Sequence, residues 1–186
     1  MAHSLTPIGN ACYPTLIVAR KQSEKAKPKF SITVAWPEGT DLSEVKAAID
    51  AVCRKKYPDG IPTRNFRYPL RSGEDKRRDD GSMTPGFQPT DTWAEFWRYE
   101  KDKNGLDNPK APVVGPTRDP IPESDIYAGC TVRVLFNPFC YDRDGNRGVS
   151  LGLEAVQKHQ DGERVGAPPV DPLSAFGDLP VEELPF

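Results

Sequence analysis

Histidine is scarce in this sequence of 186 residues, and its cysteines are few and widely separated. Only His3 and His159 are available, so a catalytic triad or an imidazole acid–base pair lacks its central residue. No C-x-x-C pair occurs, and so wide a spacing predicts neither a zinc site nor a disulfide framework. We expect structural thiols and no metal or other cofactor. The four cysteines are Cys12, Cys53, Cys130 and Cys140.

Signatures of common enzymes are also absent. The sequence has no P-loop, G-x-S-x-G elbow, H-E-x-x-H pair or dinucleotide fingerprint. These gaps leave the common motif-based enzyme mechanisms without support in the sequence. A metal-dependent nuclease or resolvase built from scattered carboxylates, such as Asp119, Glu123 and Asp125, stays open as an alternative.

Long apolar runs are missing as well. No stretch approaches the roughly 18 residues that span a membrane. The N-terminus has no basic segment followed by an apolar one, as a signal peptide would. We therefore expect a cytoplasmic protein with no membrane partner.

Proline and glycine are plentiful, with 20 and 15 residues. They leave little room for long helices and favour strands joined by punctuated loops. The composition therefore points to a β or α+β fold. With the strand patterns below we expect a mainly β domain over residues 1–161.

The N-terminal part of this domain shows two strand patterns and one helix pattern. Residues 11–21 are apolar and β-branched, and residues 30–36 alternate large with small or polar side chains. Residues 41–56 predict the α-helix, in which Asp41 or Thr40 caps the N-terminus and Glu44 completes a capping box. The large side chains of the second strand, expected on one face, are Phe30, Ile32, Val34 and Trp36.

Residues 92–101 fit either a helix or a strand. A capping box from Thr92 to Glu95 favours a helix, whereas the aromatic density and the alternation of large side chains favour a strand. Periodicity alone leaves both open. Val113 and Val114, between prolines, predict at most a short strand.

The strongest local signal is Asp144-Gly145 between two alternating segments, residues 126–141 and 148–159. Asp-Gly favours a two-residue hairpin turn, because such a turn needs positive φ. The turn pairs Phe136 with Leu153, and Val134 with Ala155, on one face of the hairpin. The opposite face is either a platform for nucleic acid, with glycines leaving open space, or a second core. That face carries Arg133, Phe139, Tyr141, Ser150, Gly152 and Lys158.

Aromatic side chains with Lys or Arg nearby are the main functional signal. Bases stack on aromatic rings and cations bind phosphates, so this combination is typical of proteins that bind single strands. Trp36 and Phe136 are expected in the core by parity. The Lys76-Arg77-Arg78 run is flanked by acids, which favours a solvated loop over a phosphate clamp. The candidate DNA-binding residues are Lys21, Lys29, Trp93, Trp97, Arg98, Tyr99, Lys101, Arg133, Phe139, Tyr141, Arg143, Arg147 and Lys158.

Charge is uneven along the chain. From residue 170 onward there are four acids and no Lys or Arg, which leaves 25 basic and 23 acidic residues before it. Residues 162–186 therefore predict a disordered acidic tail. Acids interleaved with Leu and Phe suit a basic, hydrophobic pocket on another protein, and they can also occupy the DNA groove of their own domain. The candidate partner-binding residues are Asp178, Glu182, Glu183 and Phe186.

Residues 126–133, 137–139, 145–153 and 156–158 resemble a phage family formerly known only as a domain of unknown function. That family is similar to phage single-stranded-DNA-binding proteins that have an OB-fold and an acidic tail ending in Phe. The likeness is specific in the last hairpin and looser over the N-terminal strands and helix. In the tail it is a likeness of general character and not of residue identity. Residues 59–89 and 102–111 look like long insertions, so the family assigns no groove residues there.

The resemblance implies a barrel of OB type, with residues 92–101 as a strand. It implies sequence-nonspecific binding of single-stranded DNA in replication, recombination and repair, without enzymatic activity. The expected tail partners are phage replication proteins such as a polymerase or a helicase-primase, in the cytoplasm of the infected bacterial host. A homodimer, and an adaptor that acts through the tail alone, stay open.

Overall fold

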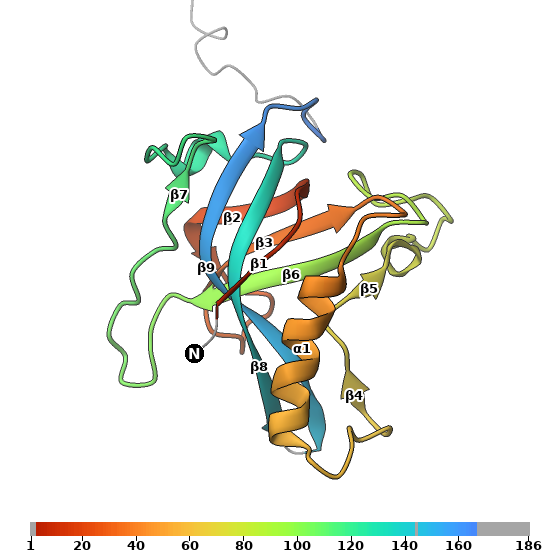
Figure 1. The fold of residues 1–186 in the computed structure, drawn as a ribbon. Helices are drawn as coiled ribbons and strands as arrows, with labels where there is room; N and C mark the ends of the chain where they lie inside the picture. The colour runs from red at the N-terminus through yellow and green to blue at the C-terminus, as the bar shows by residue number, and fades with distance from the viewer. Residues whose placement is uncertain (1–2, 144, 167–186) are drawn as a thin grey trace, which may run out of the picture.

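The computed structural model describes residues 3–143 and 145–166 (Figure 1). These residues contain one α-helix, α1 (Ser43–Lys56), and a set of β-strands. No helix in this part of the chain is long and apolar enough to cross a membrane. The short elements are β1 (Ser4–Leu5), β4 (Phe66–Arg67), β5 (Arg71–Ser72), η1 (Gly73–Lys76), β7 (Val113–Val114) and η2 (Glu123–Asp125).

Five long strands close into a barrel: β2 (Gly9–Arg20), β3 (Lys29–Trp36), β6 (Thr92–Tyr99), β8 (Thr131–Arg143) and β9 (Asn146–Gln160). β2 pairs with β3, β3 with β6, β6 with β9, β9 with β8, and β8 returns to β2. A five-stranded barrel with this closure is the architecture of the OB-fold. The predicted class, mainly β with a single α-helix, is confirmed.

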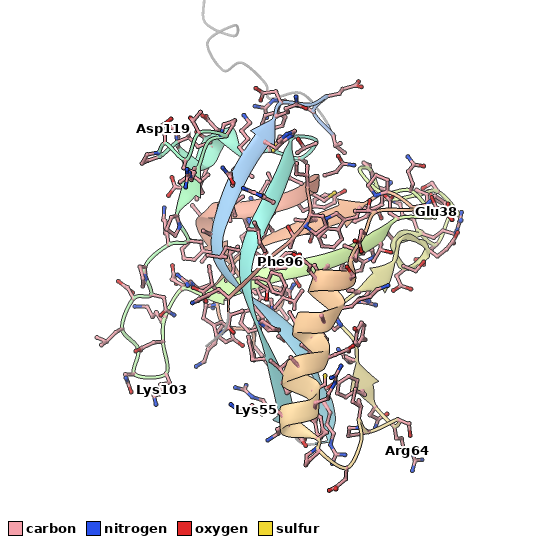
Figure 2. The ribbon with its side chains drawn as sticks, in the orientation of Figure 1. Glu38, Lys55, Arg64, Phe96, Lys103 and Asp119 are labelled. Atoms are coloured by element: carbon pink, nitrogen blue, oxygen red, sulfur yellow. The ribbon has the colours of Figure 1, made fainter. Side chains whose placement is uncertain are left out.

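The core fills the barrel with side chains from alternate strand positions. The predicted inner face of β3 is confirmed, since Phe30, Ile32, Val34 and Trp36 are all buried. Phe96 of β6 lies at the centre of the molecule (Figure 2). Its ring meets those of Trp36 and Phe136 edge to face, with centroids 6.3 and 5.4 Å apart. Such pairs stabilise a core beyond the area that they bury.

Residues 92–99 form strand β6, which settles the ambiguity of this segment. All eight residues pair with β3, from Trp36 opposite Thr92 to Lys29 opposite Tyr99. The pairing gives every second side chain a place in the core, which a helix with the same aromatic residues would not. Val113 and Val114 form the short strand β7, as predicted.

Helix α1 begins two residues later than predicted. Leu42 is the N-cap residue and makes no side-chain capping bond, so the capping box with Glu44 does not form. The Asp41 carboxylate instead accepts the backbone N–H of Ser43 at 2.9 Å. The helix packs against β8 through the side of it that contains Ile49 and Cys53.

The hairpin of β8 and β9 contains a bulge that the sequence pattern does not reveal. Phe136 faces Leu153 as predicted, but Leu135 pairs with Ala155 and Val134 with Val156, so the predicted pairing of Val134 with Ala155 is wrong. One extra residue, Glu154, lies in β9. Beyond a bulge, every side chain changes face.

Lys158 is the residue most affected by this change of face. It pairs with Val132, whose side chain points into the core. Its ammonium lies 2.7 Å from the Asp161 carboxylate, away from the face that carries Phe139 and Tyr141. Of the predicted turn, Gly145 has φ +78°, as expected, and Asp144 lies outside the described residues.

The chain beyond β9 returns to the barrel. The Val165 N–H donates to the Ala128 carbonyl at 2.9 Å, and the Tyr127 hydroxyl donates to the Gly162 carbonyl at 3.0 Å. Residues 162–165 therefore contact the body, although the tail was predicted to begin at 162. The rest of the predicted tail, with Asp178, Glu182, Glu183 and Phe186, lies outside the described residues.

The four cysteines are free thiols. Burial raises the pKa of Cys12 to about 12 and that of Cys53 to about 11. Such thiols remain protonated near neutral pH and are poor nucleophiles and metal ligands.

Candidate nucleic-acid interface

The outer face of β6 supplies the central row of the candidate site. Because Ala94 and Phe96 point into the core, the alternate side chains point outward. The cross-strand register places Ser31 of β3 on one side of Trp97 and Gly152 of β9 on the other. The outward row of β6 consists of Trp93, Glu95, Trp97 and Tyr99.

Three hollows adjoin along this row and form one groove across the outer face of the barrel. The first and second share Arg71, Trp93 and Glu95 as lining residues. The second and third share Trp97, Tyr141 and Ser150. The third hollow alone encloses about 510 Å³. The groove thus runs from β2 and β3, over β6, to the hairpin of β8 and β9.

One end of the groove, which we call the aromatic end, is formed by Trp97, Tyr99, Phe139 and Tyr141. The centroid of the Trp97 ring lies 4.7 Å from that of Tyr99 and 5.8 Å from that of Phe139. The rings are inclined at 64° and 76°, so they do not cover one another as stacked rings would. Phe139 remains 38 % exposed although it is large and apolar.

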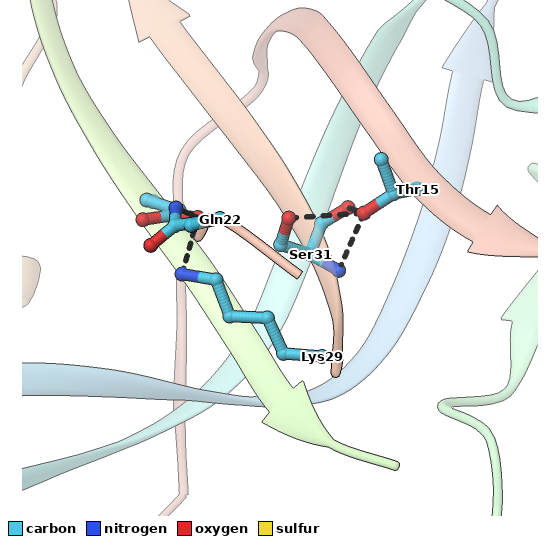
Figure 3. Close-up of polar contacts among 5 residues, drawn as sticks. Thr15, Gln22, Lys29 and Ser31 are labelled. Carbon is cyan, nitrogen blue, oxygen red and sulfur yellow. Dashed lines mark hydrogen bonds and ion pairs between the residues drawn. The ribbon is translucent and has the colours of Figure 1, made fainter. Parts of the chain in front are cut away.

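The other end, which we call the cationic end, is lined by Arg20, Lys21, Lys29, Arg71 and Lys76. Hydroxyl groups of β2 and β3 lie between these cations, among them Thr15 and Ser31. The oxygen atoms of these two hydroxyls are 3.0 Å apart (Figure 3). Cations and neutral hydroxyl donors together suit an anionic ligand.

An ion pair lies where the two ends meet. The Lys29 ammonium is 2.8 Å from the Glu95 carboxylate, and Gln22 donates to the same carboxylate at 3.3 Å (Figure 3). The Lys29 ammonium also lies 5.4 Å from the centroid of the Trp97 ring. Glu95 is thus an acid in a mainly basic groove, and it neutralises the cation nearest the aromatic end.

Trp93 differs from the expectation that it would stack on a base, because it is only 6 % exposed. Its indole N–H donates to the Ser72 carbonyl at 2.9 Å. With Cys12, Ala35 and Phe87 it forms a second, small core outside the barrel. The irregular segment that contains Ser72 and Phe87 folds over the start of β6. No periodic pattern in the sequence predicts this contact.

Most other predicted residues line the groove. Arg98 reaches its rim from the inner side of β6 and pairs with Glu154, at 2.5 Å. The groove-lining set is Lys21, Lys29, Trp97, Arg98, Tyr99, Phe139, Tyr141 and Arg143, together with the buried Trp93.

Four predicted cations lie away from the groove, and polar groups of the chain engage each of them. Lys101 pairs with Asp107 at 2.9 Å, and Lys158 pairs with Asp161. Arg147 is next in sequence to the outward-facing positions of β9 and so lies on the opposite face of the strand. It pairs with Asp142 at 3.0 Å. The Arg133 Nε donates to Gln157 at 2.8 Å, beyond the bulge. Proximity in sequence to an aromatic residue therefore did not predict whether a cation lies in the groove.

The structure adds groove residues that the sequence did not indicate, chiefly Arg20, Arg71 and Lys76. The Lys76-Arg77-Arg78 run is divided: Arg77 pairs with Glu74 at 2.9 Å in solvent, whereas Lys76 lies over the Trp93 ring. The solvated-loop interpretation therefore fits Arg77 and is wrong for Lys76. The acids on both sides of the run were the only signal in the sequence. They did not distinguish Lys76 from Arg77.

The two glycines of the hairpin, Gly148 and Gly152, differ in the space around them. A Cβ atom on Gly148 would lie 2.5 Å from the Arg67 carbonyl oxygen and 2.8 Å from the Tyr141 hydroxyl. A Cβ atom on Gly152 would lie 3.1 Å from the Asn137 carbonyl oxygen. Gly148 therefore permits β4 to approach β9, whereas Gly152 lines the open hollow of the aromatic end.

No group of three or more His, Cys, Asp or Glu side chains in residues 3–143 and 145–166 could hold a metal ion. Of the acids considered above, Asp119 pairs with the Thr117 hydroxyl and Glu123 with Lys110, at 3.6 Å.

Barrel and groove together define a class: an OB-type barrel with an aromatic and basic groove on its outer face. The sequence agrees with this class, because residues 10–183 match the family model described as Enterobacter phage Enc34, ssDNA-binding protein. The chain belongs to this family.

Solved structures similar to the chain include proteins from two phages. The single-stranded DNA-binding protein from bacteriophage Enc34 in complex with ssDNA has 19 % identity and a TM-score of 0.63, with 88 % of this chain and 89 % of that chain covered. Its C-terminal truncation has 18 % identity, a TM-score of 0.63 and 87 % coverage of both chains. The single-stranded DNA-binding protein gp2.5 of bacteriophage T7 has 14 % identity, a TM-score of 0.55 and 95 % coverage of both. At such identities these structures support the fold. A search of curated protein sequences gave no match.

Proposed function

We propose that the chain binds single-stranded DNA in the groove, without sequence readout and without enzymatic activity. The observation that carries this proposal is the cluster of Trp97, Tyr99 and Phe139, inclined rings in an open hollow that is continuous with a row of cations. Membership of the family supports it.

The two ends of the groove match the two chemical parts of a single strand. Stacking of a base on an aromatic side chain contributes about 1 to 3 kcal/mol, and every base has a face that can stack. Lys and Arg release counterions from the phosphates, which makes binding depend strongly on salt. Neither interaction distinguishes one base sequence from another.

The proposed biological role is support of phage DNA replication, recombination and repair in the infected bacterium. Residues 167–186 would recruit replication proteins such as a polymerase or a helicase-primase, and would compete with DNA for the groove. Two features support this part: the acids at the end of the sequence, which have no Lys or Arg among them, and the excess of cations in the groove.

Fluorescence anisotropy of a labelled oligo-dT, titrated with the whole chain at 50 mM and 200 mM salt, tests the proposal. We expect saturable binding that weakens with salt, and weaker binding to a duplex of equal length. Removal of residues 170–186 should preserve or raise the affinity. Absence of binding to oligo-dT at 50 mM salt would overturn the proposal.

A further inference from the structure

The cationic end of the groove holds more positive charge than the aromatic end. The hollow of the aromatic end is lined by two cations, Arg143 and Arg98, and Arg98 is paired with Glu154. At the cationic end, Lys29 and Arg71 have carboxylate partners, Glu95 and Asp75. The other three cations of this end form no ion pair with any residue in the described part of the chain. These three are Arg20, Lys21 and Lys76.

Of these three cations, Lys76 has the best-defined position. Its ammonium lies 3.9 Å from the centroid of the Trp93 ring and 5.1 Å from that of Phe87. The guanidinium of Arg71 lies 5.0 Å from the same Trp93 ring. Burial, and secondly the charge of Arg71, lower the pKa of Lys76. Two cations thus share one aromatic surface, and an anion between them would relieve their repulsion.

The backbone around Lys76 is held in place before any ligand arrives. Both the N–H and the hydroxyl of Thr84 donate to the Lys76 carbonyl, at 3.0 and 2.7 Å. The Gly73 N–H donates to the Asp91 carbonyl at 2.7 Å, which fastens the same turn to the start of β6. Preorganised cations lose less entropy on binding than cations on a free loop.

We propose that the cationic end of the groove is a phosphate-binding site, with Lys76 as its central residue and Arg71 beside it. This inference rests on the proposed function and deepens it, since it assigns the phosphodiester backbone to the cationic end and the bases to the aromatic end. The site includes Lys76, which the pattern of charges in the sequence assigned to a solvated loop.

The slope of log K against log salt concentration tests this assignment, because each phosphate neutralised on a single strand contributes about 0.7 to it. We expect Lys76→Gln to flatten the slope by about 0.7. Its binding to oligo-dT should then be about fivefold weaker at 0.1 M salt and equal to wild type near 1 M salt. Lys76→Arg, which keeps the charge, should restore the wild-type slope.

Arg77→Gln is the matched control, because Arg77 is the next residue, loses the same charge and already pairs with Glu74. It should leave the slope unchanged, as should Trp97→Ala at the aromatic end. Arg71→Gln, a second variant of the site, should flatten the slope as well. It keeps the test valid if Lys76→Gln unfolds, which circular dichroism would reveal.

The outcomes separate this inference from the proposed function. If the wild-type chain does not bind oligo-dT, the proposed function fails. If the wild-type chain binds, but folded Lys76→Gln or Arg71→Gln has the same slope as Arg77→Gln, the phosphate site is refuted and the proposed function survives.

Discussion

Strand β6 has two faces with different environments. On the inner face, Ala94 and Phe96 are completely buried in the barrel. On the outer face, Glu95, Trp97 and Tyr99 line the groove. Adjacent residues therefore contribute to different properties, the inner ones to the free energy of unfolding and the outer ones to the free energy of binding. The division depends on the two-residue period of the strand.

Phe96→Ala should have the largest effect, and it should act on stability. Removal of a buried Phe leaves a cavity among Trp36 and Phe136 and costs about 3 to 5 kcal/mol. Urea denaturation followed by circular dichroism measures it. Thr33→Ala, on the outer face of β3, is the control and should stay within about 0.5 kcal/mol of wild type. A loss below about 1 kcal/mol for Phe96→Ala would mean that this ring does not organise the core.

Trp97→Ala should weaken binding of oligo-dT by about 1 to 3 kcal/mol, or roughly 5- to 150-fold, because it removes a stacking platform. The free energy of unfolding should change by no more than about 1 kcal/mol. Calorimetric titration and urea denaturation give the two values. Trp97→Phe retains a ring and should recover most of the affinity. Equal losses for the two variants would point to a structural rather than a stacking role.

Glu95→Gln should tighten binding by about two- to fivefold at low salt. The change removes a negative charge from the groove and frees the Lys29 ammonium, whose partly exposed ion pair contributes at most about 1 kcal/mol. Anisotropy of labelled oligo-dT measures the effect, with Glu38→Gln, outside the groove, as the control. Weaker binding by Glu95→Gln would instead show that this carboxylate accepts hydrogen bonds from bases.

Lys158→Gln should have the smallest effect, less than about twofold on affinity at 0.1 M salt. Lys158 lies on the other face of β9, because of the bulge at Glu154, and it pairs with Asp161. Its salt slope should equal that of wild type. A slope flattened as much as that expected for Lys76→Gln would place DNA on both faces of the hairpin.

Regular strands were the predictable part of the fold. In β3 and β6 an unbroken alternation, with no bulge between them, carries each side chain to the face that parity assigns. The same parity failed after Glu154, because a single inserted residue in β9 reverses the faces while leaving the composition of the strand unchanged. Lys158, beyond that point in β9, was therefore placed on the wrong face. Arg133 keeps the face that parity assigns in β8, but it lies opposite Gln157, beyond the bulge and away from the groove.

The groove was largely predictable where it is built on strands, with Arg20 at the end of β2 as an exception, and less so where it is built on loops. Trp97, Phe139 and Tyr141 follow from strand parity. Arg71 and Lys76 come from a segment with no period, held by backbone bonds such as that of Thr84 to Lys76. Contacts between residues distant in sequence leave no mark in a local pattern, so these cations could be found only from the fold.

Intrinsic fluorescence of the three tryptophans offers the most direct test of DNA binding at the outer face of β6. Trp36 is buried in the barrel and Trp93 in the small core, so Trp97 alone of the three lines the open aromatic end. Oligo-dT should quench the wild-type chain, and Trp97→Phe should lose most of the quenching while still binding by anisotropy. Undiminished quenching in bound Trp97→Phe would contradict the assignment of the bases to this end of the groove.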